Sequence, residues 1–166
     1  MAARLAALDL ATYRVLRTAG HSPAAERAVR RFSALGEHAA VWLALGAAGM
    51  ALDPARRPAW RRGAAVVAGA YALNTAIKLV VRRRRPQVEG LPPLAGTPTA
   101  LSFPSAHAAS SFAAARVYSG LLPPAPLYAL AGGLALSRLY LGLHFPSDTL
   151  AGAALGLAVA ELAQRR

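Results

Sequence analysis

The chain has 166 residues, which is enough for one domain and too few for two. Hydrophobic residues make up 55% of it, above the average of about 45–50% for soluble domains, while only 16% are charged and the formal net charge is +12. This combination is typical of a membrane protein facing anionic lipid rather than a nucleic-acid-binding protein, and the absence of cysteine excludes disulfides and thiolate metal sites.

Residues 1–35 carry a basic amphipathic pattern in which arginine alternates with apolar residues. The arginines are Arg4, Arg14, Arg17, Arg27, Arg30 and Arg31, and the apolar residues are Leu5, Leu8, Leu10, Val15, Leu16 and Val29. We interpret this segment as one or two helices lying in the membrane interface. A break between two helices is predicted at residues 20–23, which read Gly-His-Ser-Pro.

Residues 36–166 continue the same single domain and contain five apolar stretches. They run approximately over Glu37–Leu52, Gly63–Val81, Ser105–Leu122, Pro126–Leu143 and Ser147–Ala163. Each is slightly shorter than the roughly 20 residues that a bilayer span needs, and their many alanines and glycines favour close helix packing. A soluble helical bundle is the alternative, but charges rarely interrupt the apolar windows. The sequence therefore predicts an all-α integral membrane bundle of about five spans.

The second stretch ends in the first of three polar motifs, Lys78-Leu-Val-Val-Arg-Arg-Arg-Arg85-Pro86. Lys78 and Arg85 are seven residues apart, so they share a face if the helix continues for two turns. Pro86 predicts a helix end just before it. Two cations at the end of an apolar span form a plausible anion clamp, although on its own the motif fits a stop-transfer run better.

The second motif, Phe103-Pro104-Ser105-Ala106-His107, precedes the third stretch. Pro104 and Ser105 predict a helix start with Ser105 as the N-cap, where free backbone N–H groups favour an anion. His107 lies in the same turn. An ordinary cap followed by an interfacial histidine is an equally good interpretation of this motif taken alone.

The third motif spans the fourth and fifth stretches and contains Ser137-Arg138, His144 and Asp148. Arg138 lies within an apolar stretch, where a charge is expensive and usually functional. Asp148, four residues after His144, is placed to accept the Nδ1 proton and leave Nε2 as a nucleophile. Arg138 and His144 do not share a helix face, so their convergence requires a bend near Gly142.

All three motifs fall on the same side of the membrane when the five stretches are counted as alternate crossings. The opposite side receives the loop around residues 56–62, the turn near Pro123 and the C-terminal Arg165-Arg166. Few carboxylates lie near the motif-bearing side, mainly Asp148 and Glu89, whereas two-metal phosphatases need a larger acidic cluster. The cations and the helix N-terminus of the motifs suit one tetrahedral anion, and two histidines and an aspartate can supply a nucleophile, an acid and an orienting group. We therefore expect phosphoryl transfer without a metal or other cofactor.

Together the motifs resemble the type 2 phosphatidic acid phosphatase superfamily, whose motifs read Lys-x6-Arg-Pro, Pro-Ser-Gly-His and Ser-Arg-x5-His-x3-Asp. Ala106 replaces the usual glycine. The resemblance implies that His144 is a nucleophile forming a phosphohistidine, that Asp148 orients it, and that His107 protonates the leaving oxygen. It also implies that the phosphate is held by Lys78, Arg85, Ser105, Ala106 and Arg138.

The whole chain also looks like the small actinobacterial members of the superfamily, which implies a polyprenylphosphoryl-phosphoribose of cell-wall arabinan synthesis as substrate. Prenyl pyrophosphate, phosphatidylglycerophosphate and phosphatidate are the alternatives. Glu37 and His38 either touch the substrate headgroup or, as we favour, are interfacial polar residues that start a helix. A vanadate-dependent haloperoxidase and a non-enzymatic lipid-phosphate binding or transport protein are the competing classes. The sequence gives no oligomeric state.

The arginines also bear on orientation, because the cytoplasmic side of a membrane protein carries an excess of basic residues. Without the motif residues, nine arginines lie on the catalytic side: six of residues 1–35 together with Arg82, Arg83 and Arg84. Six flank the stretches on the opposite side, at positions 56, 57, 61, 62, 165 and 166. The difference favours a cytoplasmic active site in a bacterial plasma membrane.

Overall fold

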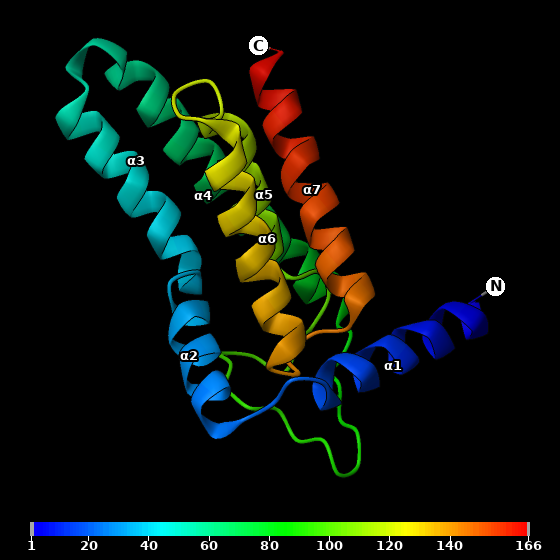
Figure 1. Cartoon of the computed structure of the whole chain (residues 1–166). Helices are drawn as coiled ribbons and strands as arrows, with labels where there is room; N and C mark the ends of the chain where they lie inside the picture. Colours follow the sequence, from blue (N-terminus) through cyan, green and yellow to red (C-terminus); the bar gives the residue numbers. More distant parts are fainter. Residues whose placement is uncertain (1, 166) are drawn as a thin grey trace.

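The computed structural model describes residues 2–165, and within them the chain is all-helical, with two isolated β-bridges and no strands. The elements are α1 (Ala2–Thr18), α2 (Pro23–Ala34), η1 (Glu37–Ala39), α3 (Ala40–Leu52), η2 (Pro54–Arg56), α4 (Arg57–Val81), α5 (Ala106–Tyr118), α6 (Pro124–Tyr140) and α7 (Pro146–Gln164). Helices α3 to α7 run side by side as a bundle, and α1 lies across one end of it (Figure 1). A long loop between α4 and α5 covers the same end.

The predicted break in the N-terminal segment is confirmed, because α1 ends at Thr18 and α2 begins at Pro23. Ser22 caps α2 by accepting a hydrogen bond from the backbone N–H of Ala25 at 3.2 Å, and proline fits the first helical position. Large apolar side chains of α1, among them Leu5 and Leu8, are exposed. The location of this segment in the membrane interface stays a prediction.

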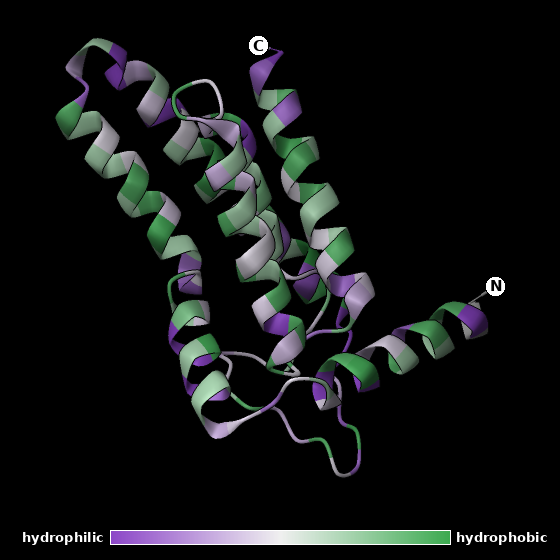
Figure 2. Cartoon of the chain, viewed as in Figure 1, coloured by the Kyte–Doolittle hydropathy of each residue, from purple (hydrophilic) through white to green (hydrophobic). Residues whose placement is uncertain are grey.

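Each of the five apolar stretches largely overlaps one helix, α3 to α7 in order. Among the described residues, only the 28-residue segment Pro54–Val81 is long and apolar enough to cross a membrane alone. The pair Pro23–Ala34 and Glu37–Leu52, bent by 46°, qualifies when it is taken together. The number of spans therefore stays a prediction, and Figure 2 shows that hydrophilic residues gather toward the ends of the bundle helices.

Helix α5 is the centre of the bundle and packs against α4, α6 and α7. It is rich in alanine and serine and buried on nearly every side, so neighbouring backbones approach it closely. An added Cβ at Gly156 of α7 would lie 2.1 Å from the carbonyl oxygen of Ala109, and one at Gly152 would lie 2.4 Å from that of Ser105. This contact fixes the spacing between the N-terminal ends of α5 and α7.

Candidate active site

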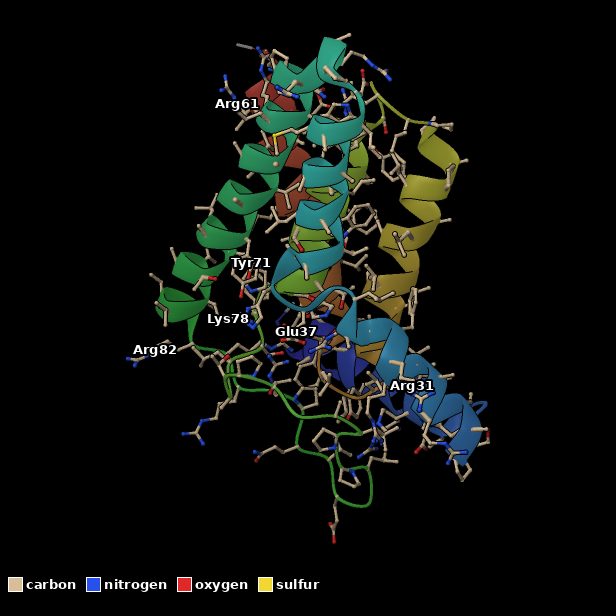
Figure 3. The ribbon with its side chains drawn as sticks, turned by 90° about the vertical axis from the view of Figure 1, so that its left-hand side faces the viewer. Arg31, Glu37, Arg61, Tyr71, Lys78 and Arg82 are labelled. Carbon is tan, nitrogen blue, oxygen red and sulfur yellow. The ribbon has the colours of Figure 1, made fainter. Side chains whose placement is uncertain are left out.

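A cleft of about 110 Å³ opens at the end of the bundle that α1 and the long loop cover. In Figure 3 the labelled Glu37, Tyr71 and Lys78 lie toward this end, whereas Arg61 lies at the opposite end. The cleft is lined by Glu37, His38, Tyr71, Thr75, Lys78, Arg85, Pro98, Thr99, Ala106, His107, Arg138 and His144. The structure thus brings residues of all three motifs to one place.

Six of the eight residues predicted from the motifs line this cleft: Lys78, Arg85, Ala106, His107, Arg138 and His144. Asp148 is completely buried and lies behind His144. Ser105 occupies the N-cap position of α5 as predicted, but its side chain makes no capping hydrogen bond and does not line the cleft. Its backbone N–H donates to the carbonyl oxygen of Asp148 at 2.9 Å, which ties α5 to α7.

The expectation that Lys78 and Arg85 share a face of one continuing helix is wrong. Helix α4 ends at Val81, because Arg82 adopts a left-handed conformation with φ of 54°. The chain then turns back, and the backbone N–H of Arg85 donates to the carbonyl oxygen of Ala100 at 3.1 Å. Arg85 therefore reaches the cleft from the loop rather than from the helix.

The bend expected near Gly142 is present. Arg138 lies in the last turn of α6, which ends at Tyr140, and Gly142 has φ of +71°. Glycine is favoured here for two reasons. It adopts a positive φ without strain, and the Cβ of any other residue would lie 2.6 Å from Nε of Arg17. The bend brings His144 to the cleft that Arg138 also lines.

The hydrogen bonds of His144 define its tautomer. Nε2 lies 3.1 Å from Nη1 of Arg85, and a guanidinium can only donate, so Nε2 carries the lone pair. Nδ1 then carries the proton and faces two acceptors, Ser102 Oγ at 3.3 Å and Asp148 Oδ2 at 3.6 Å. The neutral imidazole thus has its nucleophilic nitrogen on the side of the cleft.

Burial of the His144 ring, in the loop between α6 and α7, lowers its pKa to about 3. The nearby Arg85 also lowers this pKa, while the negatively charged Asp148 opposes the shift. Because the neutral form persists below the ordinary pKa of 6.5, the lone pair is available at neutral pH.

Asp148 is held by donors on both carboxylate oxygens. Oδ1 accepts from Arg83 Nη1 at 2.8 Å, and Oδ2 accepts from the Phe145 backbone N–H at 2.8 Å and from the Ser102 hydroxyl. A buried carboxylate requires such partners, because an unpaired charge is costly in a low-dielectric interior. Asp148 is thus fixed against His144.

Around the cleft, several cationic or polar groups keep a donor unused. Lys78 Nζ donates to the carbonyl oxygens of Leu101 and Ser102 at 3.1 and 3.3 Å, which leaves one of its three protons free. Within the described residues, Arg138 Nε and Ser105 Oγ are buried without a hydrogen-bond partner. Such groups need partners, and an anion with several acceptor oxygens supplies them.

His107 and Arg138 are both linked to Ser33 of α2. The Ser33 carbonyl oxygen accepts from His107 Nε2 at 3.1 Å, and the Ser33 hydroxyl accepts from Arg138 Nη1 at 2.9 Å. Gly36 packs on the same imidazole, where a Cβ would lie 2.7 Å from Cδ2. Ser33 and Gly36 therefore support two residues of the cleft wall from behind.

The rim of the cleft carries polar side chains that no motif contains. Glu37 and His38 begin the η1–α3 segment, and both line the cleft. His38 Nδ1 lies 2.9 Å from the hydroxyl of Tyr71, and Thr75 lies one turn further along α4. In the described residues no group of three or more histidines, aspartates and glutamates is arranged to hold a metal ion.

A model of the PAP2 superfamily matches residues 60–165. The chain is 47% identical over 127 residues to a decaprenylphosphoryl-5-phosphoribose phosphatase of Mycolicibacterium smegmatis, covering 74% of this chain and 68% of the relative. It is 43% identical over 133 residues to the protein of that name in Mycobacterium tuberculosis, and this match covers 78% of this chain and 73% of the relative. The chain therefore belongs to the PAP2 superfamily, and it is a phosphatase.

Two solved structures share its fold. LpxE of Aquifex aeolicus superposes with a TM-score of 0.77 at 24% identity, covering 96% of each chain. A transmembrane PAP2-type phosphatidylglycerolphosphate phosphatase from Bacillus subtilis also gives 0.77, at 23% identity, covering 98% of this chain and 85% of that one. The chain thus shares its arrangement of helices with both of these proteins.

Proposed function

We propose that this phosphatase removes the phosphomonoester group from a polyprenylphosphoryl-phosphoribose at the membrane surface, through a phosphohistidine on His144. The observation that carries the proposal is the neutral His144 imidazole, whose Nε2 lone pair lies on the side of a cleft lined by Lys78, Arg85 and Arg138. A phosphate in this cleft would meet both a nucleophile and the charges that stabilise a transferring phosphoryl group.

In the first step, His144 Nε2 attacks the phosphorus atom and the bond to the sugar oxygen breaks. That oxygen takes a proton from His107, so the sugar leaves as an alcohol. A phosphate anion bound in the cleft favours the imidazolium form of His107, which carries a proton on each ring nitrogen. The Ser33 carbonyl oxygen holds the one on Nε2, and the other is free to move to the leaving oxygen.

In the second step, water attacks the phosphohistidine, the P–N bond breaks and inorganic phosphate leaves. His107, now neutral, accepts the proton of the attacking water and returns to its starting form. His144 recovers the lone pair on Nε2, while Asp148 and Ser102 keep the proton on Nδ1. Lys78, Arg85 and Arg138, which line the cleft, hold the phosphate oxygens throughout both steps.

The names of the relatives from Mycolicibacterium smegmatis and Mycobacterium tuberculosis support the choice of lipid. The polar rim supports it as well, because Glu37 and Tyr71 offer hydrogen-bonding groups to the hydroxyls of a sugar beside the phosphate.

Phosphate release by the purified protein should be compared on decaprenylphosphoryl-5-phosphoribose, undecaprenyl pyrophosphate, phosphatidylglycerophosphate and phosphatidate. We expect the highest kcat/KM on the first. A preference for the diacylglycerol lipids would overturn the choice of substrate, and no release from any of the four would favour a non-enzymatic binding protein.

We further propose that the cleft faces the cytoplasm, where a sugar phosphate made from a soluble precursor is found. The excess of arginine near the catalytic end supports this orientation. With five spans the C-terminus lies on the opposite side, so a reporter fused after Arg166 should be active only outside the cytoplasm. A reporter active only inside would reverse the proposal.

A further inference from the structure

Arg83, in the loop after α4, contacts three residues that closely follow His144 in the chain. Its Nη1 donates to Ser147 Oγ at 2.7 Å and to Asp148 Oδ1 at 2.8 Å. The centre of its guanidinium also lies 4.3 Å from the centroid of the Phe145 ring, within the range of a cation–π interaction. One side chain therefore holds the whole turn that sets His144 against Asp148.

Asp9 of α1 supplies Arg83 with a second carboxylate. Arg83 Nη2 donates to Asp9 Oδ2 at 2.8 Å, so the guanidinium bridges Asp9 and Asp148 with a different nitrogen for each. Asp9 Oδ1 also accepts from the backbone N–H of Ser147 at 2.9 Å, in the first turn of α7, where a negative charge is favourable. Asp9 is only 8% exposed, so the bridge is largely shielded from water.

These two residues lie away from the phosphate cleft. Neither Asp9 nor Arg83 lines it; both line a separate apolar groove of about 470 Å³ between α1 and α7, beside Leu5, Leu8 and Leu150. They reach the site only through Asp148 and the turn around it. A role in binding the substrate phosphate directly is therefore inconsistent with their position.

We propose that Asp9 and Arg83 are positioning residues that hold Asp148 against His144 and so make α1 part of the catalytic apparatus. The inference rests on the proposed phosphohistidine mechanism. Asp148 Oδ2 lies 3.6 Å from Nδ1 of His144, which is already longer than a good hydrogen bond. Any further displacement of Asp148 frees the imidazole to rotate, and Nε2 is then misaligned for attack on phosphorus.

The test compares Arg83→Gln and Asp9→Asn with Arg82→Gln and Arg84→Gln in the full-length protein. Arg82 and Arg84 are exposed arginines of the same run, so their variants remove the same charge from the same loop. We expect Arg83→Gln to lower kcat by about 10- to 100-fold with KM changed less than about twofold. Asp9→Asn should lower kcat by about 3- to 10-fold, and both controls should keep the wild-type kcat.

Two further variants separate positioning from a general structural effect. Adding Asp9→Asn to Arg83→Gln should lower kcat by a smaller factor than Asp9→Asn does alone, because part of the effect of Asp9 passes through Arg83 and only its direct contact with Ser147 remains to be lost. Arg83→Lys keeps the charge but cannot bridge both carboxylates, so it should recover only part of the loss.

Equal kcat in Arg83→Gln and Arg82→Gln, or a loss confined to KM, would overturn the inference. If Arg83→Gln does not fold, as judged by its thermal unfolding, the comparison of Asp9→Asn with Arg84→Gln decides, and an unchanged kcat in Asp9→Asn overturns it. No phosphate release by the wild-type protein would contradict the proposed function itself.

Discussion

The two sides of the His144 ring differ in how fully their polar groups are paired. On the cleft side, Lys78 keeps a free proton and Arg138 Nε has no partner among the described residues. On the other side, both oxygens of Asp148 are occupied by donors, including Arg83. The cleft side is thus completed by a ligand, whereas the Asp148 side is complete without one.

This difference predicts two classes of variant. Substitutions on the cleft side remove interactions with the phosphate, so they change both KM and kcat. Substitutions on the Asp148 side leave the phosphate contacts in place but misalign Nε2 of His144, so they lower kcat and leave KM nearly unchanged. The following experiments test that division, beginning with the residue between the two sides.

His144→Ala removes the nucleophilic imidazole and should lower turnover by about 10⁴-fold or more, because the covalent step is lost. Phosphate release and trapping of the phosphoenzyme measure the effect. His21→Ala is the matched control. The His21 ring stacks on that of Tyr140, with 3.9 Å between the ring centroids, and does not line the cleft. Near-wild-type activity in His144→Ala would refute the phosphohistidine mechanism and, with it, the distinction between the two sides of the His144 ring.

His107→Ala should lower the rate on a sugar phosphate by about 10²- to 10⁴-fold, because the leaving oxygen is no longer protonated. A substrate with a good leaving group, such as p-nitrophenyl phosphate, should recover much of that loss. The measurement is the ratio of the two rates in the variant and in the wild type. An equal loss on both substrates would show that His107 does not act as the acid.

Arg85→Gln should lower kcat by about 10²- to 10³-fold and also raise KM, because Arg85 lines the cleft and donates toward Nε2 of His144. Inhibition by vanadate, which mimics the pentacoordinate phosphorus, should weaken in parallel. Arg82→Gln, three residues earlier and exposed, should change neither. An unchanged KM and vanadate inhibition in Arg85→Gln would place Arg85 with Arg83 and remove the distinction between the two sides.

Glu37→Gln should have a smaller and more selective effect, because Glu37 lies on the rim of the cleft and belongs to none of the three motifs. We expect kcat/KM on the phosphoribose lipid to fall by about 3- to 10-fold, with p-nitrophenyl phosphate unaffected. A loss of the same size on both substrates would assign Glu37 to the phosphate site rather than to the headgroup.

Chelation should have the smallest effect, since Lys78, Arg85 and Arg138 already supply positive charge at the cleft. Activity in excess EDTA should equal activity without it. A loss with EDTA that added magnesium reverses would show that the cleft side is completed by a metal as well as by the substrate.

The residues of the three motifs were predictable because their types and spacings are local in the sequence. The path of the chain between the motifs was harder to predict. The helix ends at Val81 because Arg82 adopts a left-handed conformation, and an arginine in the sequence does not indicate that conformation. The bend at Gly142 was inferred only as a requirement for Arg138 and His144 to converge, and glycine permits the positive φ found there.

The partners of the motif residues were missed for a different reason. Asp9 lies 74 residues from Arg83, and Ser33 lies 105 residues from Arg138, so no local pattern links them. In the sequence, Arg83 is only one of a run of four arginines, and nothing local distinguishes it from Arg82 and Arg84. Ser102, three residues before Ser105, likewise carries no spacing signal.

The glycine contacts between α7 and α5 have a consequence for how such enzymes diverge. At Gly152 and Gly156 there is no room for even one methyl group beside the backbone of α5, so substitutions there would separate the helices that carry His107 and Asp148. The rim at Glu37 and Tyr71 belongs to other elements, η1 and α4, and is free of that constraint. New headgroup preferences can therefore arise by changes at the rim while the reaction chemistry is inherited unaltered.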